Sequence, residues 1–209
     1  EEGCCGDPTR RVGNEYLFQM QAQQNIAAFQ KYGVTRVVTA CPHGYNMIRN
    51  EYPDFGLEGV QVLHHSELLA ELIDAGRLSL TSGQQLNVAF HDSCYLGRHN
   101  DVYLAPRNVI GSLKGVQIIE AGRNGTKGMC CGAGGARMWM EETIGTKVND
   151  ERSRELIETG ASRIATACPF CYVMMDDGVK GHGFEETDVR VADIAMHVLD
   201  AIEAGEAND

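Results

Sequence analysis

Residues 160–171 read G-A-S-R-I-A-T-A-C-P-F-C, and residues 33–42 read G-V-T-R-V-V-T-A-C-P. In both stretches a short run of small and β-branched residues ends at a cysteine that a proline follows directly. Proline favours the first position of a helix, so each stretch predicts a strand and then a cysteine at a helix N-terminus. The helix dipole favours a thiolate at that position. The glycine, the arginine and T-A-C-P recur at a period of about 127 residues, which indicates an internal duplication.

Five cysteines surround the second of these stretches. They lie in H-D-S-C at 91–94, M-C-C-G at 129–132 and C-P-F-C at 168–171, which gives the pattern C-x35-C-C-x36-C-x2-C. Soft thiolates grouped in this way select zinc, copper(I) or an iron–sulfur cluster. Five thiols are one more than tetrahedral zinc needs, and the neighbours Cys130 and Cys131 are poorly shaped for a disulfide. The pattern favours a metal site over the alternative of buried apolar cysteines.

Residues beside the vicinal pair suit such a site. The glycines at 132, 134 and 135 let backbone N–H groups turn towards sulfur. We expect residues 138–140, M-W-M, to open a helix and to exclude water from the site or pack in the core. Arg98 and Arg137 lie close to the cysteine loops in sequence, where they would offset negative charge or lie on the surface. His91 ends a predicted strand and is expected to be a hydrogen-bonded structural residue.

The first copy of the duplication has fewer thiols. Cys4 and Cys5 form a second vicinal pair, and Cys41 stands in T-A-C-P-H-G, but Gly44 occupies the position of Cys171. His43 offers a nitrogen ligand, although a histidine at such a position is typically a surface residue. We expect this first site to hold an altered cluster, to hold zinc or to be empty. The chain begins inside a motif and without methionine, so we expect it to be a fragment.

Strands and helices alternate along the chain. We expect strands at 34–40, 60–63, 86–91, 116–120, 164–167 and 189–191, and helices at 15–31, 42–52, 66–75, 101–113, 136–159 (one or two), 169–179 and 193–204. Ser66 and Asp193 are expected to cap helices. This alternation predicts an α/β fold of parallel sheets with helices on both faces. The cysteines then lie at the carboxyl ends of strands, where such folds bind ligands.

The two copies predict two tandem domains. We place the first at 1–80, truncated at its N-terminus, and the second at 86–209, with the boundary within 76–85. The net charge of −11 argues against nucleic-acid binding. Eight cysteines grouped in motifs indicate metal binding in a reducing compartment. No apolar run approaches the length of a membrane span.

The motifs resemble those of the cysteine-rich CCG domain family. The resemblance rests on M-C-C-G-A-G-G-A-R-M-W-M at 129–140, on C-P-H-G-Y-N-M-I-R-N-E-Y-P at 41–53 and on C-P-F-C at 168–171. The family includes the cysteine-rich subunit of heterodisulfide reductase and the membrane-linked iron–sulfur oxidoreductases that serve electron-transfer flavoproteins. The latter group is the more similar one.

The resemblance implies a cofactor and a function. In this family a complete motif binds a [4Fe–4S] cluster, which can be non-cubane, and by position its ligands are Cys94, Cys130, Cys131, Cys168 and Cys171. The implied function is electron transfer from a flavoprotein, or another redox subunit, towards quinone or a partner subunit. The implied location is the cytoplasm, at the membrane face. Two alternatives stay open: reduction of a heterodisulfide or other disulfide at the cluster, and a zinc-stabilised structural module.

Overall fold

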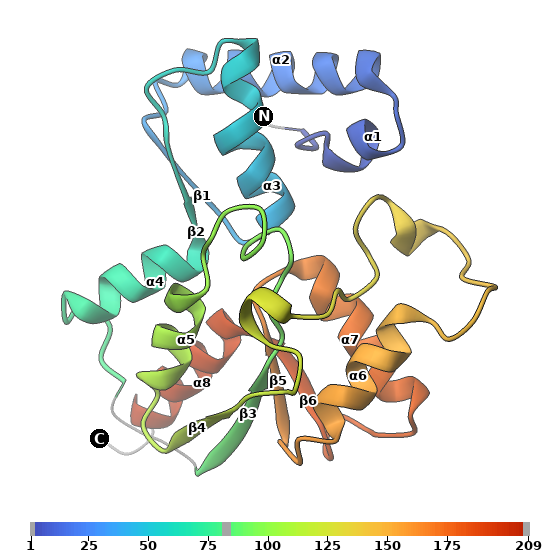
Figure 1. The fold of residues 1–209 in the computed structure, drawn as a ribbon. Helices are drawn as coiled ribbons and strands as arrows, with labels where there is room; N and C mark the ends of the chain where they lie inside the picture. The colour runs from blue at the N-terminus through green and yellow to red at the C-terminus, as the bar shows by residue number, and fades with distance from the viewer. Residues whose placement is uncertain (1–2, 81–84, 207–209) are drawn as a thin grey trace.

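The computed structural model describes residues 3–80 and 85–206 as an α/β fold with two parallel sheets (Figure 1). The larger sheet has the strand order β4-β3-β5-β6, and the smaller sheet pairs β1 with β2. Every strand pairing is parallel, as the alternation of strands and helices predicted. The strands are β1 (Arg36–Thr39), β2 (Gln61–His64), β3 (Leu86–Phe90), β4 (Val116–Ile119), β5 (Arg163–Thr166) and β6 (Arg190–Asp193).

Each predicted strand is present, and its ends differ from the expected ends by no more than two residues. Helices connect the strands. The helices are α1 (Asp7–Arg11), α2 (Glu15–Lys31), α3 (Pro42–Asn46), α4 (His65–Asp74), α5 (Leu104–Gly111), α6 (Val148–Ile157), α7 (Pro169–Gly181) and α8 (Ile194–Glu206). A π-helical turn (Met47–Glu51) and a 3-10 turn (Tyr52–Phe55) extend α3. The bounds of α2 match the prediction, and Asp193 caps α8 through a hydrogen bond from Ala195 N of 2.9 Å.

The larger sheet is covered on both faces. Side chains alternate along a strand, so Ile164 of β5 faces α6 and α7 while Ala165 faces α5 and α8. Ile164 packs with Leu156 and Met175 on the first face, and Ala165 packs with Ile110 and Ile194 on the second face. The core therefore fixes β5, and with it the position of the cysteine that follows β5.

Helices α6 and α7 pack closely because a glycine lies between them. A Cβ added to Gly178 of α7 would come within 2.8 Å of Ser153 Cβ and 2.9 Å of Asn149 O, both on α6. No side chain larger than hydrogen fits there without a shift of one helix. This contact holds α7, whose first turn carries Cys171, close against α6.

The first repeat has its own small core. Phe18 of α2 meets Phe55 edge to face, with ring centroids 5.4 Å apart, and Met47 and Tyr52 are fully buried beside them. Asn25 of α2 donates to the Tyr52 hydroxyl at 2.9 Å. The order β1, α3, β2, α4 matches β5, α7, β6, α8, in agreement with the duplication.

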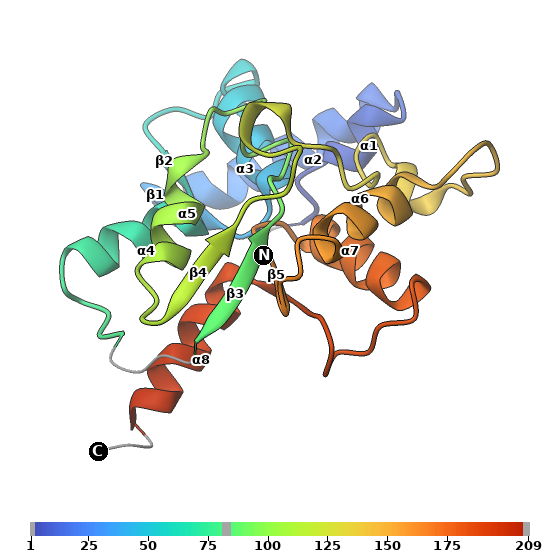
Figure 2. The same cartoon turned by 60° about the horizontal axis from the view of Figure 1, so that its bottom comes forward.

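Helix α4 joins the two repeats. Its partly buried Leu69 and Ile73 pack against Val109 of α5 and Val198 of α8, and Figure 2 shows these three helices side by side. His65, at the start of α4, is bonded through Nε2 to Asp193 Oδ1 at 2.8 Å. The core under α5 and α8 is therefore shared between the repeats.

Two of the sequence-based expectations need correction. Of the one or two helices expected over 136–159, α6 is present, but it begins only at Val148, and a short 3-10 turn at Arg137–Trp139 precedes it. Ala136 adopts a left-handed backbone with φ 62°, which prevents a continuous helix there. Ser66 does not cap α4: His64 does, since its side chain accepts from Ser66 N.

The predicted domain boundary at 76–85 includes residues 81–84, which lie outside the described residues. The division into domains at 1–80 and 86–209 stays a prediction. None of the helices in 3–80 and 85–206 combines the length and the apolar character that crossing a bilayer requires.

Candidate metal centre

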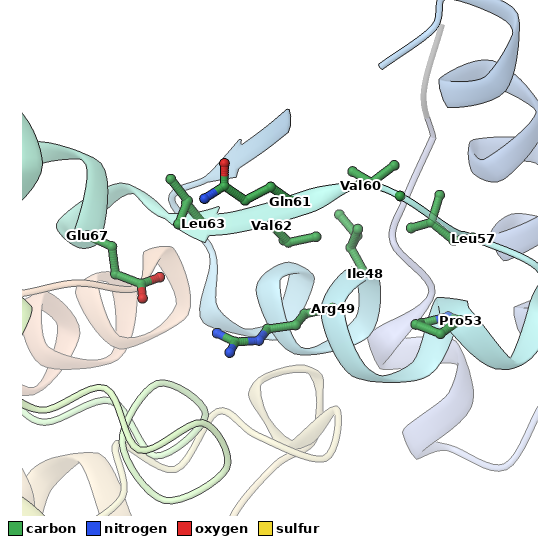
Figure 3. Close-up of a pocket in the computed structure, with 10 residues that line it drawn as sticks. Ile48, Arg49, Pro53, Leu57, Val60, Gln61, Val62, Leu63 and Glu67 are labelled. Atoms are coloured by element: carbon green, nitrogen blue, oxygen red, sulfur yellow. The ribbon is translucent and has the colours of Figure 1, made fainter. Parts of the chain in front are cut away.

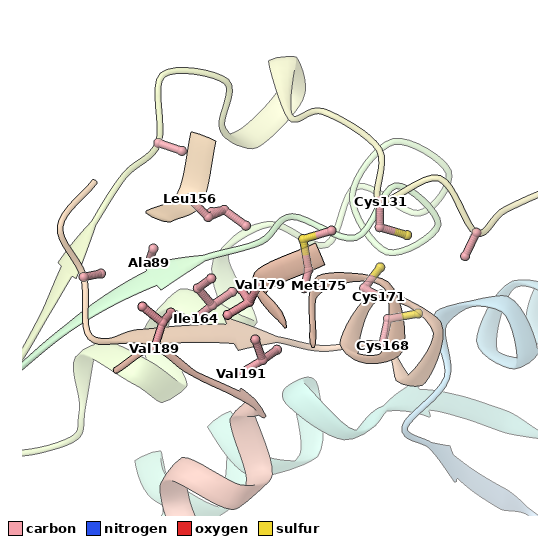
Figure 4. Close-up of a cluster of buried hydrophobic side chains, with 13 residues drawn as sticks. Ala89, Cys131, Leu156, Ile164, Cys168, Cys171, Met175, Val179, Val189 and Val191 are labelled. Carbon is pink, nitrogen blue, oxygen red and sulfur yellow. The ribbon is translucent and has the colours of Figure 1, made fainter. Parts of the chain in front are cut away.

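Five thiols of the second repeat form one continuous row. Each sulfur interacts with the next in the order Cys94, Cys130, Cys131, Cys171, Cys168. They come from the loop after β3, the loop that precedes the 3-10 turn at 137–139, the end of β5 and the first turn of α7. Figure 4 shows Cys131, Cys168 and Cys171 near one another at one end of the apolar core, with the Cys171 sulfur directed towards Cys131. These three cysteines are buried, and Cys94 and Cys130 are half-buried.

The backbone around the row directs N–H groups at sulfur. Cys168 is the N-cap of α7 with Pro169 at the first helical position, as predicted. The N–H of Gly132 donates to Cys130 Sγ at 3.3 Å. Gly132 has φ +93°, and a Cβ on it would meet Val148 Cβ at 3.1 Å, so glycine is required at this turn. Backbone donors of this kind stabilise negative charge on the sulfurs.

Asp92 ties two of the cysteine loops together. Its carboxylate accepts from Arg107 at 2.7 and 2.9 Å, and from the N–H of Gly125 at 2.7 Å. The first of these partners lies on α5, and the second lies in the loop that leads to the vicinal pair. Burial raises the Asp92 pKa, but the Arg107 hydrogen bonds and charge and the Gly125 N–H outweigh it and lower the pKa overall. The H-D-S-C stretch therefore positions Cys94 and also fixes the path to Cys130.

The pKa values of the thiols in the row differ from one thiol to the next. Hydrogen bonds from Cys131 and Cys94 lower the Cys130 pKa, and hydrogen bonds from Cys171 and Cys41 lower the Cys168 pKa. The donating thiols have raised pKa values: that of Cys131 rises to about 12, chiefly through its contact with Cys130. Thiols of the row thus have pKa values shifted in opposite directions. Ionising all five requires positive charge within the row, which is what metal ions supply.

Several residues next to the cysteines of the row in sequence have buried polar atoms without a partner. Among the described residues they include His91 Nε2, Ser93 Oγ and Thr166 Oγ1, each within three residues of a cysteine of the row. Buried polar atoms are normally hydrogen-bonded. A ring nitrogen of His91 and the sulfurs of Cys131 and Cys171 all lie within 4.8 Å of one another. The soft sulfur donors, the backbone N–H directed at Cys130 and the His91 ring beside the sulfurs fit an iron–sulfur cluster.

His91 itself is fully buried, at the carboxyl end of β3. Its Nδ1 receives a hydrogen bond of 3.1 Å from Nε of Arg152, which is also fully buried. Burial and then the positive charge of Arg152 lower the His91 pKa to about 4. Arg152 further donates to Glu155 at 2.6 Å and to the carbonyl of Arg123 at 2.9 Å. The sequence marks His91 only as a strand-end histidine, and Arg152 belongs to no motif that would single it out.

Cys41 of the first repeat reaches the same row, where it interacts with Cys168. His43 is 3 % exposed, so the expectation of a surface histidine was wrong. It interacts with Cys168, bonds through Nδ1 to Asp7 at 2.7 Å and stacks on Tyr95 at 3.9 Å. Burial lowers the His43 pKa, but Asp7 and Cys168 outweigh it and raise the pKa to about 9. The buried Asp7 that orients His43 has no signal of its own in the sequence.

Of the other two cysteines of the first repeat, Cys5 lies beside Gly44. Cys4 is exposed and interacts with the half-buried Cys5. A Cβ on Gly44 would lie 3.9 Å from Cys41 Cβ and 4.0 Å from Cys5 Sγ. A cysteine at this position would thus stand between them, as Cys171 stands in the second repeat. A metal site formed by Cys4, Cys5 and Cys41 stays a prediction.

Other sequence candidates lie on the surface. Arg98 is exposed, although its charge acts on Cys94. Arg137 is exposed and pairs with Glu142 at 3.3 Å. Trp139 is not part of an α-helix that shields the row from water, as was expected. It is 61 % exposed, and its ring meets that of Phe170 edge to face at a centroid distance of 5.7 Å. Met140 is exposed as well, and only Met138 packs against the core that contains the cysteines.

A pocket of about 490 Å³ lies away from the thiols, between the π-helical turn and β2 (Figure 3). Arg49 and Glu67 stand at one end of it, and Leu57 and Val60 at the other. Its lining, within the described part of the chain, includes no cysteine. The cysteine row is therefore the candidate centre.

Comparison with known proteins agrees with this geometry. The CCG cysteine-rich domain model matches residues 1–49 and 88–176, and these two regions contain all eight cysteines. The chain belongs to the CCG family. The two matched regions correspond to the two repeats, each of which contributes a parallel sheet flanked by helices.

Three relatives illustrate the similarity. "Probable iron-sulfur-binding oxidoreductase FadF" of Bacillus subtilis is 48 % identical over 181 residues, which is 87 % of this chain and 26 % of the relative. "EtfAB:quinone oxidoreductase" of Syntrophomonas wolfei is 44 % identical over 210 residues, 97 % of this chain and 29 % of the relative. One subunit of the dihydromethanophenazine:CoB–CoM heterodisulfide reductase of Methanosarcina barkeri is 31 % identical over 207 residues, 97 % of this chain and 50 % of the relative. The chain thus spans about a quarter to a half of the relatives it matches.

Proposed function

We propose that the chain is the cluster-binding part of an iron–sulfur oxidoreductase that transfers electrons. The cluster is a [4Fe–4S] cluster of the non-cubane type, and the five thiols of the row hold it. The observation that carries the proposal is the row itself, in which five thiols from separate segments each interact with the next at one edge of the parallel sheet. When bound, the cluster supplies a site that takes up and releases one electron at a time.

The surrounding residues have defined tasks in this proposal. Cys168 and Cys171 bind from the positive end of α7, and the N–H of Gly132 stabilises charge on Cys130. Met175 is fully buried behind the row and excludes water from its apolar side. Because Cys94 and Cys130 are half-buried, electrons enter or leave on their side.

The partners belong to the same proposal. Two of the relatives are named for iron–sulfur binding and for EtfAB:quinone oxidoreduction. By analogy, the donor for this chain is an electron-transfer flavoprotein or another redox subunit, and the acceptor is quinone, reached through the rest of the parent protein. The setting is the cytoplasmic face of a membrane. One relative is named a "Probable membrane-anchored ferredoxin".

Reduction of a disulfide at the cluster is the second candidate. It is favoured by the similarity to a heterodisulfide reductase and by the partial exposure of Cys94 and Cys130. In that case a substrate sulfur would approach from the exposed side. If a reduced flavoprotein reduces the cluster in a stopped-flow experiment and no disulfide is turned over, the result favours the first candidate, electron transfer. If adding a disulfide reoxidises the reduced protein, the result favours the second candidate, disulfide reduction.

Purification under anaerobic conditions tests the proposal itself. We expect a brown protein that contains iron and acid-labile sulfide in equal amounts near four per chain, with an EPR signal in one redox state. A colourless protein that contains zinc alone would instead support a zinc-stabilised structural module. The first site is tested in the same samples, since a second cluster or zinc at Cys4, Cys5 and Cys41 would raise the metal content.

A further inference from the structure

The side chain of His91 has one nitrogen engaged and one without a partner. Nε of Arg152 reaches His91 Nδ1 at 3.1 Å. A guanidinium nitrogen only donates, so Nδ1 accepts and the proton of the neutral ring is on Nε2. Nε2 therefore presents an N–H that has no acceptor among the described residues, although the ring is fully buried.

The arrangement of His91 is fixed from two sides. Its backbone N–H donates to the carbonyl of Ala165 at 2.9 Å, which continues the pairing of β3 with β5. Arg152 is held in turn by Glu155 at 2.6 Å and by the Arg123 carbonyl at 2.9 Å. The imidazole consequently has little freedom to turn its N–H elsewhere.

The sulfurs of Cys131 and Cys171 are suitable acceptors close to the ring. They and a ring nitrogen of His91 lie within 4.8 Å of one another. A histidine that ligates metal commonly donates its other N–H to a carboxylate or a carbonyl, which leaves the ligating nitrogen unprotonated. His91 is set up in the opposite way, because Arg152 donates to it and the proton is left on the nitrogen with no partner.

We propose that His91 is not a ligand but a positioning residue, whose Nε2–H donates a hydrogen bond to a sulfur of the bound cluster at Cys131 or Cys171. The inference rests on the cluster proposed above. Reduction adds one electron from an external donor, such as a flavin, and increases the negative charge on the sulfurs. The hydrogen bond is then stronger in the reduced state, so it raises the reduction potential. The N–H stays on His91 in both states, and no proton is transferred.

Two substitutions separate the two nitrogens. His91→Asn keeps an acceptor at the Nδ1 position for Arg152 but loses the distal donor. His91→Gln places an amide N–H near the Nε2 position. The matched control is His197→Asn, since His197 is also buried with an unpartnered Nε2 and has no cysteine among its electrostatic neighbours.

EPR-monitored redox titration of the cluster-loaded protein gives the readout. We expect His91→Asn to lower the reduced-to-oxidised ratio at a fixed ambient potential by about ten-fold, which for one electron is a shift of about 59 mV to more negative potential. His91→Gln should recover most of that shift, and His197→Asn should leave the potential unchanged. Equal potentials in His91→Asn and the wild type, with the cluster intact, would overturn the inference while leaving the proposed function untouched.

A second measurement compares the wild-type protein with His91→Asn, because His43 also interacts with Cys168. Pulsed EPR of the wild-type protein labelled with [15N]histidine should show a weak nitrogen coupling, together with a deuteron that exchanges in from D2O, and the same labelled His91→Asn protein should lose both. A strong coupling typical of a direct iron–nitrogen bond would refute the donor role, and so would the absence of any histidine coupling. If the wild-type protein holds no cluster in the iron and sulfide analysis, the proposed function fails first and the inference fails with it.

Discussion

Replacing Cys171 by serine removes an interior thiol of the row, the one that links Cys131 to Cys168. Cys171 interacts with both of these cysteines, so its loss separates Cys168 from the other three thiols. It is 2 % exposed, and α7 carries no second cysteine that could take its place. The hydroxyl of serine is a hard donor that holds iron poorly. Because loss of even an outer partner of a metal ligand costs about 10–100-fold in affinity, we expect loss of this ligand to cost at least about 100-fold.

The assay is iron content and visible absorbance after anaerobic reconstitution at matched protein concentration. Cys171→Ser should lose most of both. Cys41→Ser, at the far end of the row and in contact with Cys168, should keep most of them, and so should Cys4→Ser, whose thiol is exposed and outside the row. Far-UV circular dichroism of the metal-free proteins checks that each variant folds. The reasoning is refuted if Cys41→Ser and Cys171→Ser lose equal amounts of iron, or if Cys41→Ser alone bleaches the protein.

Two further predictions concern stability. Gly178→Ala should destabilise the fold by about 1–3 kcal/mol, because the new methyl group overpacks against Ser153. The control Gly181→Ala should change stability little, because its new Cβ would lie 3.8 Å from the nearest atom. Urea denaturation of both variants measures the two free energies of unfolding. Burial raises the Glu155 pKa, but bonds from the Arg123 N–H and Arg152 lower it below its usual 4.5. The ionised Glu155 carboxylate therefore stabilises the fold above pH 4.5, and this stabilisation is lost as the pH falls through the lower folded-state pKa. In Glu155→Gln the free energy of unfolding should consequently fall less steeply below pH 4.5 than in the wild type. Identical acid-unfolding profiles of the two proteins would contradict this prediction.

The sequence predicted those parts of the site that depend on local signals. Cys168 at the end of a strand and before Pro169 is a helix N-cap in the structure, as C-P-F-C indicated. The strand ends placed the other cysteine loops at one sheet edge, because parallel strands present their carboxyl ends together. The T-A-C-P repeat also predicted that Cys41 would precede a helix.

Features that depend on tertiary packing escaped prediction. The burial of His43 requires Asp7 and Tyr95, which lie far from it in sequence and carry no motif of their own. Cys41 meets Cys168 only because the two repeats face each other across the row. The stretch after Gly135 has helical composition, but the left-handed Ala136 stops it, and Glu142 then accepts from Val148 N to start α6 later.

Helix α4 gives the duplicated fold a single cooperative core. By sequence it belongs to the first repeat, and by packing it covers α5 and α8 of the second repeat. His64 is the last residue of β2 and His65 is the first residue of α4, so no linker separates the sheet of the first repeat from the helix that packs on the second repeat. We expect one thermal transition rather than two. An exchange of repeats between relatives would have to transplant α4 together with the faces of α5 and α8 that it covers, or else redesign the apolar surface between them.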